Sequence, residues 1–494
     1  MFSTPHTSHV RTYTNVARAL TDQGHTTYVC VPQFMLDANL VDTHGTKIIA
    51  YGRYLKNSED VLFGKILDKF WRGESGGVTD FIALVKKMQS VIRQILSDKL
   101  LMKQIKDLKP DLLVLSNFAP FRNFVMISHI MDVPFVYLGP HNDLAGQRVP
   151  FSPSSVPCPF HQGFSERGMS FVDRLKTAAC NLLVIAVDYY FMDDKMVQEF
   201  APHRPRASVG EISRRAQLYI IESDHILDFP KPELPNMKLI GSTAVSLPRP
   251  LGEPFRSFVE GSRAGIAVVS FGTSVLAIPK AVSQKMISAF LQQELDVVWR
   301  ANVSSAHPDR IMTSHWLPQN DLLAHPKTKL FVSHCGTNGQ YEALYHAVPI
   351  LCLPLIGEQL YNSHRSKSKG FGLTASILDI SDKRLARLMR RVAESDKYRG
   401  SIKRASEFFR MLYKAPDQAA AFWINHVMEH GGRYMKSAAQ DMPVYQFLVL
   451  DGFGVVVATI VIVVAVLSLL CWCGCRALRR VSGKFWQRVK FKGE

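Results

Sequence analysis

The stretch that decides the fold lies at residues 316–372 and reads WLPQNDLLAHPKTKLFVSHCGTNGQYEALYHAVPILCLPLIGEQLYNSHRSKSKGFG. Within it, KLFVS has the apolar run of a buried strand, and the strand ends at His334. The small residues of the turn at 335–339 let backbone N–H groups approach a ligand, and the N-terminus of the following helix attracts anions. The stretch therefore predicts a phosphate-binding turn at the carboxyl end of a buried strand.

Asn338 and Glu342 are four residues apart, so they share one face of the helix that follows this turn. A carboxylate at this place is suited to accept hydrogen bonds from two ribose hydroxyls. The alternative is that Glu342 only interacts favourably with the positive end of the helix dipole. From these residues alone both interpretations stay open.

The sequence on either side of this stretch repeats a strand–helix pattern. GIAVVSF (265–271) and DVVWR (296–300) have the composition of buried strands, and Pro279 opens a helix between them. PILCLP (349–354) adds a further strand, and helical patterns follow it as far as residue 430. This alternation predicts a doubly wound α/β domain at 265–435.

A second α/β half is expected at 1–241. A helical apolar pattern opens it, at Val10, Tyr13, Ala17 and Leu20. Three later segments have the composition of strands in a parallel sheet: TTYVCV (26–31), DLLVLS (111–116) and PFVYLG (134–139). A Pro- and Gly-rich linker at 242–264 joins the halves. We expect two domains that face a cleft and bind ligands outside the carboxyl ends of their strands.

One apolar segment near the C-terminus is long enough to cross a membrane. Residues 452–475 are uncharged, and a helix of that length spans about 36 Å against a hydrocarbon core of about 30 Å. A buried core helix is the alternative. We predict a transmembrane helix at 447–475 and a basic tail at 476–494 that is cytoplasmic by its charge. The cations of the tail are Arg476, Arg479, Arg480, Lys484, Arg488, Lys490 and Lys492.

The N-terminus does not fit this topology as it stands. The start MFSTPHTSHVRTY lacks the apolar core of a signal peptide, and residues 1–5 are too short for the strand that should precede the first helix. We therefore expect an upstream signal peptide and first strand in the natural chain. The chain is then a single-pass protein of the endoplasmic reticulum membrane with its bulk in the lumen. The Lys-x-Lys-x-x ending at 490–494 resembles a retrieval signal, and Asn302 opens the one glycosylation sequon.

Composition excludes several classes of protein. The net charge of +17 arises from 59 basic and 42 acidic residues and is not gathered into an arm, so a nucleic-acid binder is not expected. The eight cysteines hold no CxxC pair, which predicts neither a disulfide framework nor a zinc site. Cys471, Cys473 and Cys475 suit thiols at a membrane boundary, and the other five are expected to be buried and inert. A nicotinamide-dependent oxidoreductase would need a GxGxxG turn, which neither half has.

The decisive stretch resembles the donor-binding signature of the UDP-glycosyltransferase family, of the animal membrane-bound UDP-glucuronosyltransferase type. WLPQNDLL, the strand ending in Ser-His, the Asn-Gly-x-x-Glu helix start, the Val-Pro strand and the Gly-Glu-Gln turn occur in order. Further agreeing pieces are PSSVP (153–157), MSFVDRLK (169–176), FPKPELPN (229–236), VVSFGTSV (268–275), VVWR (297–300) and INHVMEHGG (424–432). The resemblance implies the GT-B fold of two Rossmann-like domains and an inverting mechanism without a metal or other cofactor. The chain has no Asp-x-Asp pair.

The resemblance also assigns roles to residues of the C-terminal half. Trp316 would stack on uracil, with Gln319 and Arg300 at the same end of the pocket. Glu342 would hold the ribose hydroxyls. The diphosphate would be bound by Thr273, His334, Gly336, Asn338 and Gly339, and the donor sugar by Glu358 and Gln359. Considered separately, Trp316 also suits a core position and Gln319 a helix cap.

His9 is the catalytic base that the resemblance implies. It lies in a Thr-Ser-His context at the start of the first helix, and an imidazole suits the removal of a proton from an acceptor hydroxyl. His6 is the local competitor, and a surface histidine is the alternative. In the family an Asp that follows the strand at 111–116 orients the base. Here Ser116 and Asn117 stand at that place, and neither stabilises an imidazolium as a carboxylate would.

These observations predict an enzyme that transfers a sugar, with glucuronic acid favoured, from a UDP-sugar to hydroxyl groups of small lipophilic acceptors. A UDP-glucose-dependent transferase is one alternative. A weakly active relative that binds UDP-sugar without useful turnover is another. The expected partners are the donor, the acceptor and a membrane, without nucleic acid, and homo-oligomerisation stays open.

Overall fold

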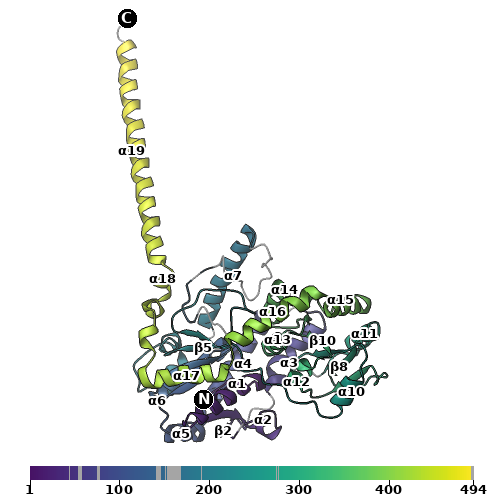
Figure 1. Ribbon diagram of the computed structural model, residues 1–494. Helices are drawn as coiled ribbons and strands as arrows, with labels where there is room; N and C mark the ends of the chain where they lie inside the picture. The colour runs from purple at the N-terminus through teal and green to yellow at the C-terminus, as the bar shows by residue number, and fades with distance from the viewer. Residues whose placement is uncertain are drawn as a thin grey trace. The chain divides into compact units, whose positions relative to one another are not determined.

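The structure is a computed structural model that describes residues 1–43, 45–53, 58–74, 78–140, 146–150, 152, 169–190, 192–273, 275 and 277–490. It divides into two compact units, Met1–Lys436 and Ser437–Glu494 (Figure 1). Most of residues 141–168, Ser274 and the final 491–494 with Lys492 lie outside the described residues.

A six-stranded parallel sheet organises the C-terminal half of the first unit. Its order is β12-β11-β10-β7-β8-β9, and neighbouring strands pair in parallel. The sequence order of strands runs outward in both directions from β7 and β10, so the order reverses between these two strands. Such a reversal is the place where open α/β sheets bind ligands. The strands are β7 (Ile266–Ser270), β8 (Asp296–Arg300), β9 (Ile311–Ser314), β10 (Thr328–Ser333), β11 (Ile350–Cys352) and β12 (Gly372–Thr374).

Both faces of this sheet are buried, which explains the nearly continuous apolar strands. Val269 packs on the face covered by α11 and α15, and Val268 packs on the opposite face beside α12, α13 and α16. The predicted helix after Pro279 is confirmed as α11. The helices that follow β7 are α11 (Lys280–Leu291), α12 (Gln319–Ala324), α13 (Thr337–Tyr345), α14 (Gln359–Ser368), α15 (Asp382–Glu394), α16 (Asp396–Leu412) and α17 (Pro416–His430).

The N-terminal half carries two further parallel sheets, β1-β2 and β3-β4-β5-β6. Phe2 forms parallel bridges to both Cys30 and Leu115, so residues 1–3 occupy the place between the two sheets where a first strand was expected. The backbone N–H of Phe2 donates to Val114 at 2.7 Å, and its carbonyl accepts from Ser116 at 3.2 Å. The strands are β1 (Tyr28–Pro32), β2 (Lys47–Tyr51), β3 (Leu113–Ser116), β4 (Phe135–Gly139), β5 (Tyr219–Ile221) and β6 (Met237–Leu239).

Helices surround these sheets, and the first of them, α1, follows the Phe2 bridge directly. The elements of this part are α1 (Thr7–Asp22), α2 (Gln33–Asp37), α3 (Ser58–Trp71), α4 (Val78–Ser97), α5 (Lys99–Asp107), η1 (Ala119–Phe124), α6 (Val125–Met131), α7 (Phe171–Tyr190), α8 (Lys195–Phe200), α9 (Val209–Ser213) and α10 (Phe255–Gly261).

Helix α17, near the end of the first unit, packs against the N-terminal half. Ala421 and Ile424 of α17 are buried in the same apolar cluster as Val10 and Tyr13 of α1. The predicted boundaries between the halves stay predictions, because Met1–Lys436 forms one compact unit.

The expectation about the interior cysteines is wrong for part of the set. Cys335 and Cys352 form a disulfide, and Cys180 is disulfide-bonded as well. The reason is spatial: Cys335 follows β10 and Cys352 ends the adjacent β11, so their Cα atoms lie 5.5 Å apart, within the range that a disulfide spans. Cys30 is buried and free, as expected.

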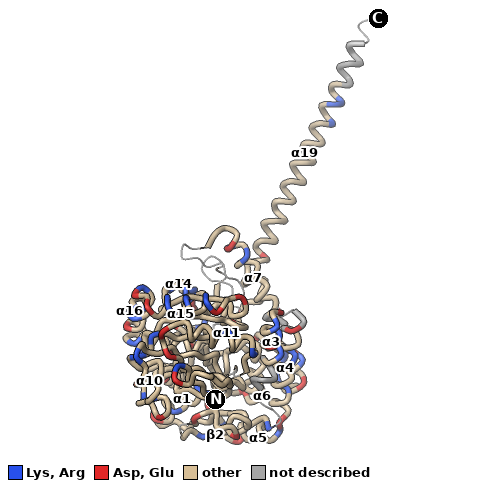
Figure 2. The backbone as a smooth tube through the Cα atoms, turned by 90° about the vertical axis from the view of Figure 1, so that its right-hand side faces the viewer, with Lys and Arg blue, Asp and Glu red and all other residues tan. Residues whose placement is uncertain are grey.

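The second unit contains the candidate membrane span. The helix α19 (Leu450–Lys490) follows the short α18 (Val444–Phe447). Within it, residues Leu450–Ser482 are long and apolar enough to cross a membrane, and in the described part of the chain one such helix occurs. Figure 2 shows α19 without charge over most of its length, whereas Lys and Arg are interspersed with Asp and Glu over the first unit.

Candidate functional site

His334 stands at the carboxyl end of β10, where the order of the strands reverses. Its imidazole lies between two glycines, one after β7 and one in the turn after β10. A Cβ atom built on Gly272 would lie 2.7 Å from His334 Nε2, and one built on Gly336 would lie 2.6 Å away. Both distances are shorter than side chains tolerate, so the two loops can meet around this ring only because neither residue carries a side chain.

Arg300 holds the first of these loops in place. It ends β8, and its guanidinium donates to the carbonyl oxygens of Gly272 and, at 3.4 Å, Thr273. The pKa of His334 is lowered to about 4, chiefly by burial; a hydrogen bond from the ring to the Ser270 backbone raises it in part, and the nearby Arg300 cation adds to the lowering. The ring is therefore neutral at physiological pH and serves as a hydrogen-bonding group rather than as a cation.

The helix α13 begins directly after the second loop. Gly336 is its N-cap residue and supplies no side-chain cap, so the first N–H groups of the helix are left for a ligand. Asn338 lies half-buried in this first turn. Gly339 lets the start of α13 pack closely against its neighbours, because a Cβ atom there would lie 3.2 Å from the Phe331 ring and 3.5 Å from Gln319 Nε2. The turn thus has the form of an anion site.

Gln319 and Glu342 are brought together from two helices. The Gln319 amide, in the first turn of α12, donates to the Glu342 carboxylate of α13. Glu342 is only 5% exposed, and this burial raises the pKa of its carboxyl group, which the Gln319 hydrogen bond partly offsets. Trp316, just before α12, is 64% exposed, so its ring is open to a planar ligand and is not a core residue.

Glu358 and Gln359 lie at the start of α14, where Glu358 is the exposed N-cap residue. The side-chain carbonyl of Gln359 accepts from the N–H groups of Leu355 at 2.8 Å and Ile356 at 3.1 Å. Gln359 therefore fixes the loop that leads from β11 into α14, and its amide NH₂ is the part that remains for a ligand.

His9 occupies the corresponding end of the N-terminal half, in the first turn of α1. Its Nδ1 lies 2.6 Å from the Thr4 hydroxyl, and Thr4 is fully buried. The residues expected to orient His9 form hydrogen bonds to other groups. Ser116 accepts from the Phe118 N–H at 3.3 Å, and Asn117 donates to the Gly139 carbonyl at 3.0 Å. Thr4 was missed by the sequence argument, because no motif marks a threonine at that place.

A small cavity of about 10 Å³ adjoins this end of the sheet. Ser116, Asn117 and Phe118 line it together with polar side chains such as Tyr137 and Ser213. Its volume suits one water molecule among polar groups.

Comparison with known proteins identifies the chain. The family model described as "UDP-glucoronosyl and UDP-glucosyl transferase" matches residues 2–485. The chain belongs to this family. It is 30% identical to UDP-glucuronosyltransferase 1A1 of Mus musculus over 77% of this chain and 72% of that protein. It is 27% identical to UDP-glucuronosyltransferase 1A7 of the same organism over 98% and 93% of the two chains.

Solved structures agree on the fold. The glycotransferase of kitacinnamycin superposes with a TM-score of 0.57 at 15% identity, over 87% of this chain and 98% of that chain. The spinosyn forosaminyltransferase SpnP superposes with a TM-score of 0.58 at 14% identity and the same coverage. The predicted GT-B fold is thereby confirmed, and the protein is a UDP-glycosyltransferase. The roles of individual site residues stay predictions.

The contact between His334 and the two loops gives a steric test. Gly336→Ala should displace the His334 ring and weaken UDP binding by about 1–3 kcal/mol, the usual cost of overpacking. Gly252→Ala is the matched control, since a Cβ at Gly252 meets nothing within 4 Å. Isothermal titration calorimetry with UDP compares the two, and equal affinities would contradict this role of the contact.

The environment of Glu342 gives a pH test. Ribose hydroxyls donate to a carboxylate, so protonation of Glu342 should abolish that part of UDP binding. Because burial raises the pKa of this carboxyl group, affinity should be complete above the raised pKa and should fall as the pH drops through it. Glu342→Gln should bind UDP more weakly by about 1–3 kcal/mol and without this pH dependence. An identical pH profile in wild type and variant would refute the assignment.

Proposed function

We propose that the protein transfers glucuronic acid from UDP-glucuronate to hydroxyl groups of small lipophilic acceptors, with inversion and with His9 as general base. The observation that carries the proposal is the convergence of His334, the α13 N-terminus and the Gln319–Glu342 pair where the strand order reverses. The curated relatives reported above are named as glucuronosyltransferases, which favours glucuronate over glucose as the donor sugar.

The C-terminal half would bind the UDP-sugar donor, and its contacts begin at the nucleotide. The exposed Trp316 ring stacks on uracil, and Glu342 accepts from the ribose. The first N–H groups of α13 and the neutral His334 receive the diphosphate. As the bond to the sugar breaks, negative charge grows on the leaving UDP, where these fixed donors stabilise it. No step in this scheme requires a metal ion, so turnover should survive chelation with EDTA.

The N-terminal half would activate the acceptor. If the Thr4 hydroxyl accepts the Nδ1–H of His9, Nε2 is left unprotonated and can take the proton of an acceptor hydroxyl. The acceptor oxygen then bonds to the anomeric carbon on the face opposite the leaving UDP. The proton ends on His9 and the electron pair of the broken bond on UDP, so the product has inverted configuration.

A weakly active relative is the second candidate. It is favoured by Ser116 and Asn117, which replace the carboxylate that the family resemblance leads one to expect after β3. A threonine hydroxyl orients an imidazole but does not stabilise its charged form as a carboxylate does. This candidate binds UDP-sugars with the same site and differs only in turnover.

The proposed location is the membrane of the endoplasmic reticulum, with one span and the first unit in the lumen. Two observations support it. The disulfide between Cys335 and Cys352 suits an oxidising compartment, and Asn302 of the sequon is exposed. The basic residues after the span favour a cytoplasmic tail.

Removal of the base tests the mechanism. His9→Ala should lower turnover by about 10²–10⁴-fold and leave UDP affinity unchanged, because the donor site lies in the other half. His25→Ala, just past the far end of α1, is the matched control. Initial rates with a panel of phenols, measured with UDP-glucuronate and with UDP-glucose, also decide the donor. Equal rates for His9→Ala and wild type would refute the role of His9 as general base.

The missing carboxylate after β3 has a separate test. Asn117→Asp should raise turnover if the absence of a carboxylate there limits the rate.

Topology has its own test in sealed microsomes. The first unit should resist added protease until detergent is present, and Asn302→Gln should remove an endoglycosidase-sensitive shift. Digestion of the first unit without detergent would contradict the lumenal location.

A further inference from the structure

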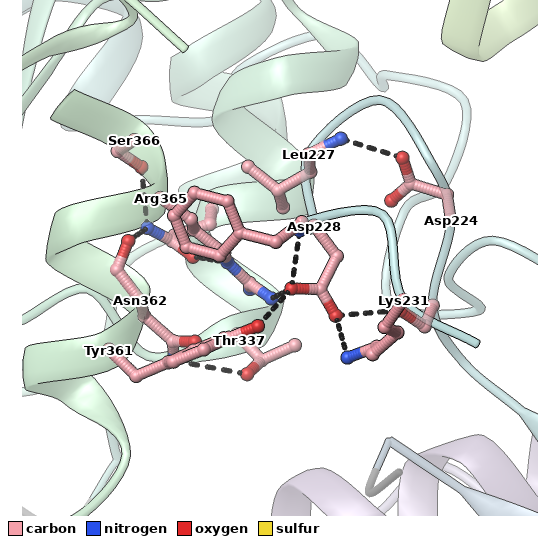
Figure 3. Close-up of polar contacts among 12 residues, drawn as sticks. Asp224, Leu227, Asp228, Lys231, Thr337, Tyr361, Asn362, Arg365 and Ser366 are labelled. Carbon is pink, nitrogen blue, oxygen red and sulfur yellow. Dashed lines mark hydrogen bonds and ion pairs between the residues drawn. The ribbon is translucent and has the colours of Figure 1, made fainter. Parts of the chain in front are cut away.

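A buried ionic network joins the two halves of the first unit. One side of it is the segment between β5 and β6, which carries Asp228 and Lys231, and the other side is α14, which carries Tyr361 and Arg365 (Figure 3). The side chains of Asp228 and Arg365 are 6% and 5% exposed, and that of Lys231 is 10% exposed. The network plays no part in the chemistry derived above.

Asp228 is the centre of the network. Its Oδ1 accepts from the Tyr361 hydroxyl at 2.7 Å and lies 3.8 Å from Arg365 Nη1, and its Oδ2 accepts from Lys231 Nζ at 2.6 Å. Burial alone would raise the pKa of this carboxyl group, but the Lys231 and Arg365 cations and the Tyr361 hydroxyl hold it well below its usual range. The carboxylate is therefore charged throughout the physiological range.

The network continues from α14 into α13. Arg365 Nε donates to the side-chain carbonyl of Gln340 at 2.8 Å, and the Gln340 amide donates to Ser366 Oγ at 2.6 Å. The Asn362 amide reaches the Thr337 hydroxyl, in the first turn of α13, at 3.3 Å. One carboxylate from the acceptor half thus holds α14 directly and α13 through it, and these helices begin at the sugar and diphosphate ends of the donor site.

Such a network is poorly explained as a source of stability. The free energy needed to remove charged groups from water is nearly as large as the free energy gained from their attraction. Well-packed apolar residues therefore often replace buried ion pairs without loss of stability. What a network of directional bonds supplies is a defined geometry. Tyr361 is two residues after Gln359, within the same first turn of α14, so the bond to Asp228 acts almost directly on the sugar-binding end of this helix.

We propose that Asp228, Tyr361 and Arg365 are positioning residues for the donor sugar. They hold α14 so that Glu358 and Gln359 meet the sugar, whereas the uracil and ribose contacts on α12 and α13 are set by other bonds. This role rests on the proposed donor site and adds to it a contribution from the acceptor half. The network should matter more for UDP-glucuronate than for UDP, because it holds α14 directly and α13 only through α14.

Four variants and one control test this role. Tyr361→Phe keeps the ring and removes one hydrogen bond, and Asp228→Asn removes the charge. Arg365→Lys keeps a cation, whereas Arg365→Gln removes it. Tyr398→Phe is the control, because Tyr398 is a buried core tyrosine of the same half outside the network. Calorimetry should be run on each full-length variant with UDP and with UDP-glucuronate, with thermal unfolding measured in parallel.

The expected result is a split between the two ligands. Affinity for UDP-glucuronate should fall about 3- to 10-fold in Tyr361→Phe and further in Asp228→Asn, as expected for lost hydrogen bonds to a charged group. Affinity for UDP should fall less, by about twofold at most, because the network reaches α13 only indirectly. Arg365→Lys should retain more UDP-glucuronate affinity than Arg365→Gln, and Tyr398→Phe should match wild type.

Two results would overturn the role. Equal weakening of UDP and UDP-glucuronate would show a general structural effect, and unchanged affinities in Tyr361→Phe and Arg365→Gln would show that the network does not position the sugar site. Tyr361→Phe decides the matter even if Asp228→Asn fails to fold. Failure of the wild-type protein to bind UDP at all is a different result, which refutes the donor site itself and this role with it.

Discussion

The placement of the His334 ring between Gly272 and Gly336 is the contact on which the donor end of the sheet depends. It joins the loop after β7 to the turn after β10, the two segments that leave the sheet where its strand order reverses. Arg300 fixes the first segment from β8, and the start of α13 fixes the second. Parallel sheets leave a crevice at such a reversal in any case. In this chain the His334 imidazole, uncharged at physiological pH, lies between the two loops at that reversal.

Much of the C-terminal half could be predicted from its sequence, for a physical reason. β7, β8 and β10 are buried on both faces, so their apolar runs are unbroken, and the glycines that follow β7 and β10 mark the loops. Short or half-exposed elements left no comparable signal. β2, β9 and β12 were not predicted, since each has at most two buried residues in its pattern. The disulfide between Cys335 and Cys352 depends on the packing of neighbouring strands and has no local pattern, and no motif marks Thr4, five residues before His9, as a partner of that ring.

Two buried carboxylates in the segment after β5 bind other parts of the first unit in opposite electrostatic environments. Glu222, at the end of β5, accepts from the hydroxyls of Thr12 and Thr243, and burial among these neutral donors raises the pKa of its carboxyl group. Asp228, six residues later, lies between the Lys231 and Arg365 cations, which lower the pKa of its carboxyl group. Glu222 ties α1, which carries His9, to the linker, and Asp228 ties the same segment to α14. The segment after β5 therefore touches the helices that carry both halves of the proposed chemistry.

The Cys335–Cys352 bond also bears on how the protein is made. It spans 17 residues of sequence and closes a loop that contains the whole of α13. A cross-link over roughly 15 residues typically stabilises a folded state by about 3 kcal/mol. A host that keeps its cytosol reducing would leave this loop uncrosslinked while the rest of the sheet folds normally. The folded transferase from such a host is then less stable by about that amount, so passage through an oxidising compartment should raise the yield of folded protein.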